Sequence, residues 1–479
     1  MIEATKIPAD TLGIFAEDIS PNAIEVVNTL QDAGYQAYVV GGGIRDLLLD
    51  LEPKDFDVAT DAHPDTVKEL FGKNCRLVGR RFRLAHVRIK REIIEVATFR
   101  AAPDNINPEN TINPENPEDE YNDGDFEHEG DINHEEGHAP GESISHGEGI
   151  RHGEDISSEG LLLRDNVFGT LEEDAIRRDF TVNALYYDPS EHVILDFFNG
   201  LEDLDNDQLV MIGCAQKRCQ EDPVRTLRAA RLASKLDFEI PEDLEDAIAE
   251  QSVLLDHVPP ARKFDEFLKL FIGGYATQTL QTLLKYDLLI YLFPCCSRIE
   301  SHPYLHKMIE QTAINTDERI KAGKHITPAF LLAAILWYSY TDKLEALKQS
   351  KEELERSIYS EAFNSIIFQQ SMSLSIPKRF SMRMREIWEL QSRLAKRQGK
   401  LAFRTLEHPR FRAAYDFLLL RESIGEIKKG LGDWWTEFQF ADTNRQQAMV
   451  QALGKKKRKK KPKNYGNQAL PNSPSGNHF

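Results

Sequence analysis

The sequence predicts an α+β protein in which a mixed head of strands and helices precedes a long all-helical region. In the N-terminal part, short runs rich in β-branched and aromatic residues alternate with segments of helical period. After Ala215, nearly every segment has the 3.6-residue period of an amphipathic helix. A third kind of segment, 104–160, contains almost no large apolar side chains and cannot bury a core.

The elements of the head follow from apolar period and turn residues, after a lead-in over 1–20 that is expected to be weakly ordered. We expect, in order, a helix over 22–33, a strand near 36–40, a helix over 43–50, a strand near 55–59, a helix over 64–71 with Pro64 in its first turn, and a hairpin of 84–89 and 93–99. Beyond the insert, 170–187 predicts a helix with an acidic first turn and a second helix after Asp179. A strand near 193–198 follows.

The rest of the chain is predicted as an array of helices. Their expected limits are 222–236, 242–254, 260–272, 276–289, 305–314, 328–340, 343–358, 361–373, 379–396, 409–422 and 433–439. The predicted domains are a flexible lead-in (1–20), a head (21–103 and 161–212), a disordered acidic insert (104–160), a helical neck (213–275), a helical body and tail (276–454) and a basic disordered tail (455–479).

The net charge of -19 is unevenly distributed. Residues 104–160 hold 18 acidic residues against one basic residue, Arg151, whereas 455–463 reads KKKRKKKPK. The insert is predicted to be a solvated loop, although weak metal binding by its five histidines and a charge shield that repels stray RNA are alternatives. The basic tail can contact phosphates without sequence choice, or it can serve as a solubility or targeting tail.

No apolar run is long enough for a membrane span, and no secretory signal follows Met1. The five cysteines are scattered and odd in number, which favours reduced thiols over a disulfide framework. We therefore expect a cytoplasmic protein.

The strongest chemical signal is the pair Asp55 and Asp57, twelve residues after the glycine run Gly41-Gly42-Gly43. On a strand, alternate side chains share a face, so both carboxylates are expected to point the same way. Such a pair suits a hard cation such as Mg²⁺. The glycines let backbone amides approach a phosphate, at the positive end of the helix that follows. Together these parts predict two-metal phosphoryl or nucleotidyl transfer.

Four motifs in a fixed order make the pattern specific. They are Val-Gly-Gly-Gly-Ile-Arg-Asp (40–46), Asp-Phe-Asp (55–57), Arg-Arg-Asp-Phe-Thr-Val-Asn-Ala-Leu (177–185) and Glu-Asp-Pro-Val-Arg-Thr-Leu-Arg-Ala-Ala-Arg (221–231). This order resembles the class II nucleotidyltransferase family, which holds bacterial poly(A) polymerases and tRNA CCA-adding enzymes. The resemblance implies a polymerase-β-like nucleotidyltransferase head followed by a helical neck, body and tail. It also implies a two-metal Mg²⁺ site, a nucleotide substrate and RNA 3′ ends as the acceptor.

The resemblance assigns roles to individual residues. Asp55 and Asp57 would hold the metals, and a third catalytic carboxylate is expected: Asp179 is preferred over Glu95, with N-capping of the following helix as the alternative role of Asp179. The residues expected to bind the nucleotide and its phosphates are Gly42, Gly43, Arg45, Arg177, Arg178, Asn183, Asp222, Arg225, Arg228 and Arg231. Among these, Asp222 and Arg225 are one helical turn apart and are expected to act together at the base edge; a solvated salt bridge is the alternative.

The branch of the family is suggested by Gly79-Arg80-Arg81-Phe82, which resembles bacterial poly(A) polymerases. The expected activity is therefore template-independent addition of AMP from ATP to RNA. A tRNA CCA-adding enzyme and a catalytically decayed RNA-binding protein are the alternatives. The residues expected to bind RNA are Arg80, Arg81, Lys455, Lys456, Lys457, Arg458, Lys459, Lys460 and Lys461. We expect a monomer, with RNA-decay proteins as candidate partners.

Aromatic residues near the C-terminus are expected to pack in a core rather than to stack on bases. They are Phe403, Phe411, Tyr415, Trp434 and Trp435.

Overall fold

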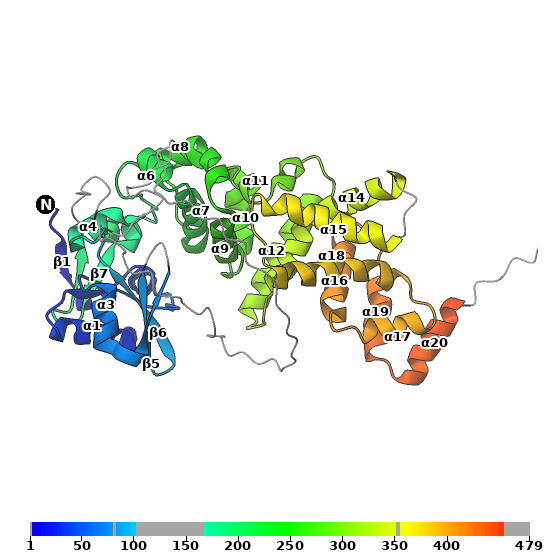
Figure 1. Ribbon diagram of the computed structural model, residues 1–479, viewed down its shortest axis with the longest axis horizontal. Coiled ribbons are helices and arrows are strands. Elements are labelled where there is room, and N and C mark those ends of the chain that lie inside the picture. Colours follow the sequence, from blue (N-terminus) through cyan, green and yellow to red (C-terminus); the bar gives the residue numbers. More distant parts are fainter. Residues whose placement is uncertain (1, 80–82, 102–166, 351–354, 455–479) are drawn as a thin grey trace, which may run out of the picture. The chain divides into compact units, whose positions relative to one another are not determined.

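The computed structural model describes residues 2–79, 83–101, 167–350 and 355–454 (Figure 1). The acidic insert 104–160, Arg80, Arg81 and the basic residues 455–461 lie outside the described residues, so the expectations for them stay predictions. Contacts divide the chain into two compact units. The first comprises Met1–Cys296, Thr316–Lys324 and Gln370–Ser375, and the second Ser297–Asn315, His325–Gln369 and Ile376–Phe479.

The first unit contains a sheet of eight strands in the order β1-β8-β7-β2-β3-β6-β5-β4. Their bounds are β1 Thr5–Pro8, β2 Ala37–Val40, β3 Asp57–Thr60, β4 Cys75–Val78, β5 Leu84–Ile89, β6 Glu92–Thr98, β7 Leu185–Asp188 and β8 Val193–Asp196. Only β3 and β6 run parallel among these pairs. The predicted hairpin is confirmed as β5 and β6, because its apolar alternation buries Ala85, Val87 and Ile94.

Among the helices that precede β7 in the described part of the head, side chains cap the first and the last. These helices are α1 Pro21–Asp32, α2 Gly42–Leu48, α3 Pro64–Phe71 and α4 Leu171–Arg177. The Ser20 hydroxyl accepts hydrogen bonds from the first backbone amides of α1. Thr170 and Glu173 form a reciprocal capping box at the start of α4. The helix predicted over 64–71 is confirmed at both of its ends.

Two expectations for the head are wrong. Residues 5–8 are not part of an irregular lead-in, because β1 pairs in antiparallel register with β8. A second helix does not follow Asp179: a single 3-10 turn, Thr181–Asn183, leads directly into β7. The aromatic pair Tyr186 and Tyr187 favours a strand, and both side chains are fully buried in the sheet.

The two ends of the segment 102–166 are held together by backbone hydrogen bonds. The amide of Ala101 donates to the carbonyl of Val167 at 3.0 Å, and the amide of Gly169 donates to that of Phe99 at 3.0 Å. Arg100 and Phe168 form an antiparallel bridge between them. The chain therefore leaves β6 and returns towards α4 at one point of the head.

Helices follow the sheet in the first unit. They are α5 Gly200–Asp205, α6 Ala215–Glu221, α7 Val224–Leu236, α8 Glu242–Gln251, α9 Pro260–Phe271, α10 Ala276–Lys285 and α11 Leu289–Leu292. α7 packs against α6, α9 and α10. Phe267 and Phe271 of α9 and Phe293 form a buried aromatic cluster. α12, Leu305–Lys321, contributes Asp317, whose carboxylate accepts the first amides of α10 at 2.7 and 2.9 Å.

The second unit is helical in its described part. Its helices are α13 Pro328–Ile335, α14 Trp337–Ser350, α15 Glu355–Ser371, α16 Lys378–Ala395, α17 Lys400–Leu406, α18 Phe411–Ser423, α19 Leu431–Phe440 and α20 Thr443–Gly454. The helices expected over 343–358 and 361–373 differ most from the structure. The first corresponds to α14, which begins at Trp337, and the second to α15, which begins at Glu355, six residues earlier than expected. Sequence reasoning missed α17 and α20. No helix among the described residues is long and apolar enough to cross a membrane.

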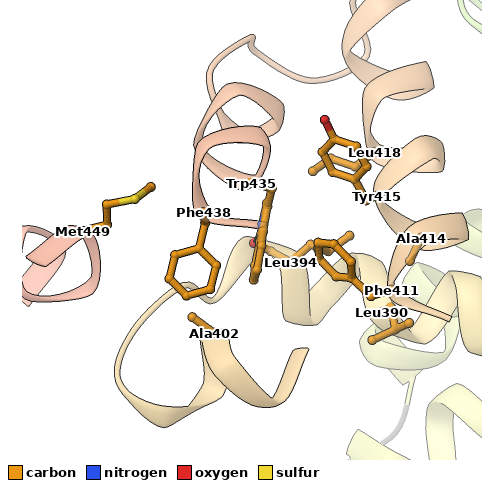
Figure 2. Packing of buried hydrophobic residues seen from close by; sticks show 10 residues of the cluster. All are labelled: Leu390, Leu394, Ala402, Phe411, Ala414, Tyr415, Leu418, Trp435, Phe438 and Met449. Atoms are coloured by element: carbon orange, nitrogen blue, oxygen red, sulfur yellow. Dashed lines mark hydrogen bonds between the residues drawn. The ribbon is translucent and has the colours of Figure 1, made fainter. Parts of the chain in front are cut away.

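Trp435 is the centre of a core formed by α16 to α20 (Figure 2). Its indole is fully buried, and its Nε1 donates to the carbonyl of Leu394 at 2.9 Å. Phe411 and Phe438 pack on the indole, with ring centroids 5.4 and 5.5 Å away. The expectation that these aromatic residues pack in a core is confirmed for Phe411, Tyr415 and Trp435, and Phe403 and Trp434 pack against the same cluster.

We predict that Trp435→Ala lowers the free energy of local opening around α19 by about 3–5 kcal/mol, because it leaves a cavity and an unsatisfied carbonyl. Hydrogen–deuterium exchange of the α16 and α19 amides measures this opening. Phe440→Ala is the matched control, since Phe440 ends the same helix but is 79% exposed. Equal exchange in the two variants would contradict the assigned core.

Candidate active site

Asp55 and Asp57 lie at the start of a central strand. The strand β3 begins at Asp57, so the predicted strand start near residue 55 is wrong and Asp55 belongs to the preceding turn. Alternation nevertheless continues into that turn, because Phe56 is buried and both carboxylates are exposed. The two acidic side chains therefore leave the backbone on the same side.

Glu95 reaches the same place from the neighbouring strand. The parallel register of β3 and β6 pairs Val58 with Val96, which puts Asp57 and Glu95 side by side one residue earlier. Although Asp57 keeps exposed surface, the protein around its carboxylate displaces part of its water, and this first and then the negative charges of Glu95 and Asp55 raise its pKa to about 7. Carboxylates that repel one another in this way favour a cation between them.

The carboxylates near the start of β3 suit a Mg²⁺ ion that keeps several of its water ligands. Among the residues with described positions, no group of three or more side chains has the geometry of a complete metal site. Mg²⁺ is commonly held by one or two carboxylates, with water and substrate phosphates as the other ligands. Asp55 and Asp57, with Glu95 beside them, satisfy this requirement.

The glycine turn packs directly against the carboxylate turn. Gly41 has φ +84°, in the region that favours glycine, and it precedes α2, whose first two residues are Gly42 and Gly43. A Cβ on Gly43 would lie 2.8 Å from Cδ1 of Phe56 and 2.9 Å from the carbonyl oxygen of Asp55. A larger residue at Gly43 would therefore displace Asp55.

Arg178 supplies a positive charge next to these turns. Its Nη1 is 3.6 Å from the position of a Cβ on Gly41, and its charge lowers the pKa of Asp57. Nε donates to the Tyr186 hydroxyl at 2.8 Å, and Nη2 pairs with Asp174 at 3.2 Å. Burial alone would lower the pKa of Arg178, but Tyr186 and Asp174 outweigh it and raise the pKa. The guanidinium therefore stays charged.

A chain of polar contacts links this region to α7. The guanidinium of Arg45 donates to Asp46 at 2.6 Å and to Oδ1 of Asn183 at 2.5 Å, and Asp46 also pairs with Lys235 at 2.7 Å. Asn183 donates to Asp179 at 3.4 Å. Arg45 is 4% exposed, so its guanidinium is engaged inside the protein rather than open to a triphosphate.

Asp179 is the last member of this chain of polar contacts and links Asn183 to Arg228 of α7. Its carboxylate is buried, pairs with Arg228 of α7 and accepts the amide of Phe180 at 3.0 Å. Burial would raise the pKa of Asp179, but Arg228 and then Arg225 outweigh it and lower the pKa. The side chain does not cap a helix, since the 3-10 turn after it has no side-chain cap. Sequence reasoning missed Asp46 and Lys235, although Lys235 lies seven residues after Arg228, on the same helical face.

Buried arginines crowd together where α6 meets the end of α4. Arg218 of α6 donates to the carbonyls of Arg177 and Arg178 at 2.6 and 2.7 Å. The pKa of Arg177 is lowered to about 9, first by burial and then by the neighbouring arginines, of which Arg100 has the largest effect. Burial and Arg225 lower that of Arg218 to about 10. Glu221 pairs with Arg218 at 3.2 Å and with Arg225 at 3.3 Å, and the positive charge that it leaves uncompensated favours an anionic ligand. Sequence reasoning did not single out Arg218.

Asp222 and Arg225 do not pair with each other through their side chains. α6 ends at Glu221 and α7 begins at Val224, so Asp222 lies between two helices rather than one turn along a single helix. The carboxylate of Asp222 pairs with Arg262 of α9. Nη1 of Arg225 donates to the carbonyl of Arg218 at 2.6 Å and to Glu221 at 3.3 Å.

Family models match three stretches of the chain. They are described as "Poly A polymerase head domain" over 37–210, "Probable RNA and SrmB- binding site of polymerase A" over 237–299, and "Polymerase A arginine-rich C-terminus" over 352–468. The chain is also 40% identical to poly(A) polymerase I of Haemophilus influenzae, over 96% of this chain and 93% of that protein. The chain belongs to the bacterial poly(A) polymerase family. Poly(A) polymerase I of Escherichia coli O157:H7 is likewise 40% identical, over 94% of this chain and 89% of that protein.

The other branch of the superfamily matches over a shorter stretch. A CCA-adding enzyme of Bacillus subtilis is 33% identical over 56% of this chain and 54% of that protein. Among solved structures, "tRNA-processing enzyme (apo form I)" has a TM-score of 0.53 and 20% identity, over 92% of this chain and 97% of that one. This likeness confirms the predicted fold, in which a helical body follows an α+β head.

We predict that Asp57→Asn stabilises the metal-free protein at high pH. The folded-state pKa of about 7 lies above the ordinary value of 3.8, so folding favours the protonated carboxyl and wild-type stability falls as pH rises between these values. Asparagine cannot ionise, so the stability of the variant relative to wild type should grow over that window and level off above it.

Thermal unfolding in the presence of a chelator, at a series of pH values, measures this difference. Asp32→Asn, at an exposed position at the end of α1, is the control and should follow wild type. A difference between Asp57→Asn and wild type that does not change with pH would contradict the raised pKa.

Proposed function

We propose that this protein is a template-independent poly(A) polymerase that transfers AMP from ATP to RNA 3′ ends and releases pyrophosphate. One observation carries the proposal: Asp55 and Asp57 leave one side of the turn that packs against the glycine turn, and the charges of Glu95 and Arg178 both act on Asp57. The family relationship supports the choice of poly(A) addition, because the two relatives described above match nearly the whole chain.

In this reaction, the RNA 3′ oxygen attacks the α-phosphorus of ATP and the bond to the β-phosphate breaks. Asp55 and Asp57, with Glu95 beside them, would hold Mg²⁺, which would make the 3′ hydroxyl easier to deprotonate, with its proton passing to solvent, and would neutralise charge on the pyrophosphate. Arg178, beside Asp57, is placed to contact the phosphates, and Gly42 and Gly43 let the backbone approach them. Arg177 and Arg218 add positive charge to the same side of the site.

The third carboxylate of the site is Glu95 rather than Asp179 in this proposal. Glu95 is exposed, and its charge raises the pKa of Asp57. Asp179 is buried and neutralised by Arg228. Its role is to hold Asn183, and through Asn183 the buried Arg45, in the wall of the nucleotide pocket.

Selection of ATP falls to Asp222, between α6 and α7, and to Arg225 of α7, with Arg228 further along that helix. For RNA we propose contacts with Arg80, Arg81 and the basic residues 455–461, and with the stretch 237–299, whose family description names RNA and SrmB. RNA-decay proteins as partners, a monomeric state and a cytoplasmic location complete the proposal.

The proposal is tested by extension of a short unstructured RNA and of a tRNA that lacks its 3′ end, each with single nucleotides and Mg²⁺. We expect a long ladder from ATP alone on the unstructured RNA. Addition to the tRNA only, with a need for CTP and a stop after about three steps, would favour the CCA-adding function instead.

We predict that Asp55→Ala and Asp57→Ala lower the rate of AMP addition on the order of 10³-fold, since each removes a metal ligand. Glu95→Gln should raise the Mg²⁺ concentration needed for half-maximal rate. Asp179→Asn should leave that concentration near the wild-type value and raise KM for ATP. The opposite pattern, with Mg²⁺ dependence changed only in Asp179→Asn, would return the third-carboxylate role to Asp179.

A further inference from the structure

His86 lies beside Glu95 in the outer part of the sheet. The antiparallel register of β5 and β6 pairs these two residues directly, and the parallel register of β3 and β6 puts Asp57 on the other flank of Glu95. Residues that are paired across neighbouring strands point to the same face of a sheet. Asp57, Glu95 and His86 therefore form a row of three side chains across β3, β6 and β5.

The imidazole of His86 contacts the carboxylate in the middle of this row. Its Nε2 is 3.4 Å from Oε1 of Glu95, and the two side chains are 29% and 51% exposed, so both can be reached from solvent. An imidazole that carries a proton on Nε2 donates towards the carboxylate, both in its charged form and in one of its two neutral forms. Hydrogen bonds at catalytic sites are often long in the free enzyme and shorten in the complex with substrate.

Glu95 has more freedom of movement than the two aspartates. The turn that carries Asp55 packs against Gly43, and the short side chains of Asp55 and Asp57 leave this turn and the start of β3 directly. Glu95 has one methylene group more, so its carboxylate can adopt more positions, and holding such a side chain in one rotamer costs free energy. A neighbouring donor that selects one rotamer in advance lowers this cost when a cation binds.

The contact of His86 is compatible with metal binding by the same carboxylate. It is made to Oε1, and a carboxylate that accepts a donor on one oxygen can still offer the other oxygen to a cation. In metal sites, the carboxylates that bind the ion are themselves held by hydrogen bonds from neighbouring groups. His86 has the chemistry and the place in the sheet for this supporting contact.

We propose that His86 is a positioning residue that holds the carboxylate of Glu95 in the orientation that binds Mg²⁺. The inference rests on the proposed function, in which Glu95 lies beside the metal-binding aspartates. His86 acts through Glu95 and touches neither the metal nor the nucleotide. Loss of its Nε2 donor therefore weakens the metal site only as long as Glu95 keeps its carboxylate.

The test measures Mn²⁺ binding to the full chain by electron paramagnetic resonance, with Mn²⁺ as the probe for the Mg²⁺ site and no nucleotide added. Wild type is compared with His86→Leu, which keeps a side chain of similar size but has no N–H donor, and with His86→Gln, whose amide can donate from a similar position. Residues 104–160 contain many acidic residues and five histidines, so the binding that remains in Asp57→Ala is subtracted.

The dissociation constant of the Mn²⁺ site should rise on the order of tenfold in His86→Leu and stay nearer to the wild-type value in His86→Gln. In a Glu95→Gln background, His86→Leu should have no further effect, because the carboxylate that it positions has been removed. The Mg²⁺ concentration for half-maximal AMP addition should change in the same order among these variants.

His63→Leu is the matched control. His63 lies at the other end of β3, before α3, where its side chain caps no helix and its ring packs against Phe168. This variant should bind Mn²⁺ as wild type does. If His86→Leu does not fold by circular dichroism, His86→Ala takes its place in every comparison.

Three results would overturn the inference. They are unchanged Mn²⁺ binding in His86→Leu, an equal loss in His86→Leu and His86→Gln, and an equal effect of His86→Leu with and without the carboxylate of Glu95. Weaker binding of a short RNA together with unchanged Mn²⁺ binding would make His86 an RNA contact instead. Absence of ATP-dependent RNA extension by wild type would refute the proposed function, and it is measured separately from Mn²⁺ binding.

Discussion

The candidate site depends on one chain of polar contacts that joins α2 and the 3-10 turn before β7 to α7. It runs from Arg228 through Asp179, Asn183, Arg45 and Asp46 to Lys235, and it returns to its start along two turns of α7. Each charge in it has an opposite neighbour. Removal of Arg228 or Lys235 would leave the buried carboxylate of Asp179 or Asp46 with less compensation, which destabilises the folded protein. The chain therefore ties α7 to α2 and to the 3-10 turn before β7.

Two groups of like charges lie in the first unit. The charges of Glu95 and Asp55 add to the effect of burial on Asp57 and raise its pKa. Arg177 and Arg218 repel their arginine neighbours, and their pKa values are lowered. A cation and a polyphosphate bound together would relieve both repulsions at once. Charges that are held in place before binding would suit the transfer reaction proposed above.

Local features of this chain could be predicted from its sequence, whereas pairings between distant segments could not. The hairpin, the helix after Pro64 and the exposed carboxylates on both sides of Phe56 follow from alternation and turn chemistry over a few residues. The parallel pairing of β3 with β6 depends on the whole sheet, and it alone brings Glu95 to Asp57. The expected pairing of Asp222 with Arg225 failed because it also depends on a distant segment. The helix breaks at Asp222, and the carboxylate of Asp222 pairs with Arg262, forty residues away. The residues of β7 were expected to be helical because their burial on both faces hides the strand period.

The hydrogen-bonded stem formed by Phe99, Ala101, Val167 and Gly169 has a consequence for how this protein can change over evolutionary time. The stem holds the two ends of the segment 102–166 together, so the distance between these ends in the folded head does not depend on the length of the segment. The entropy of closing a flexible loop grows only with the logarithm of its length, by about 0.6 kcal/mol for each doubling. As long as the hydrogen bonds of the stem are kept, a change in the number of residues between Ala101 and Val167 is therefore expected to alter the closure entropy of the head only slightly.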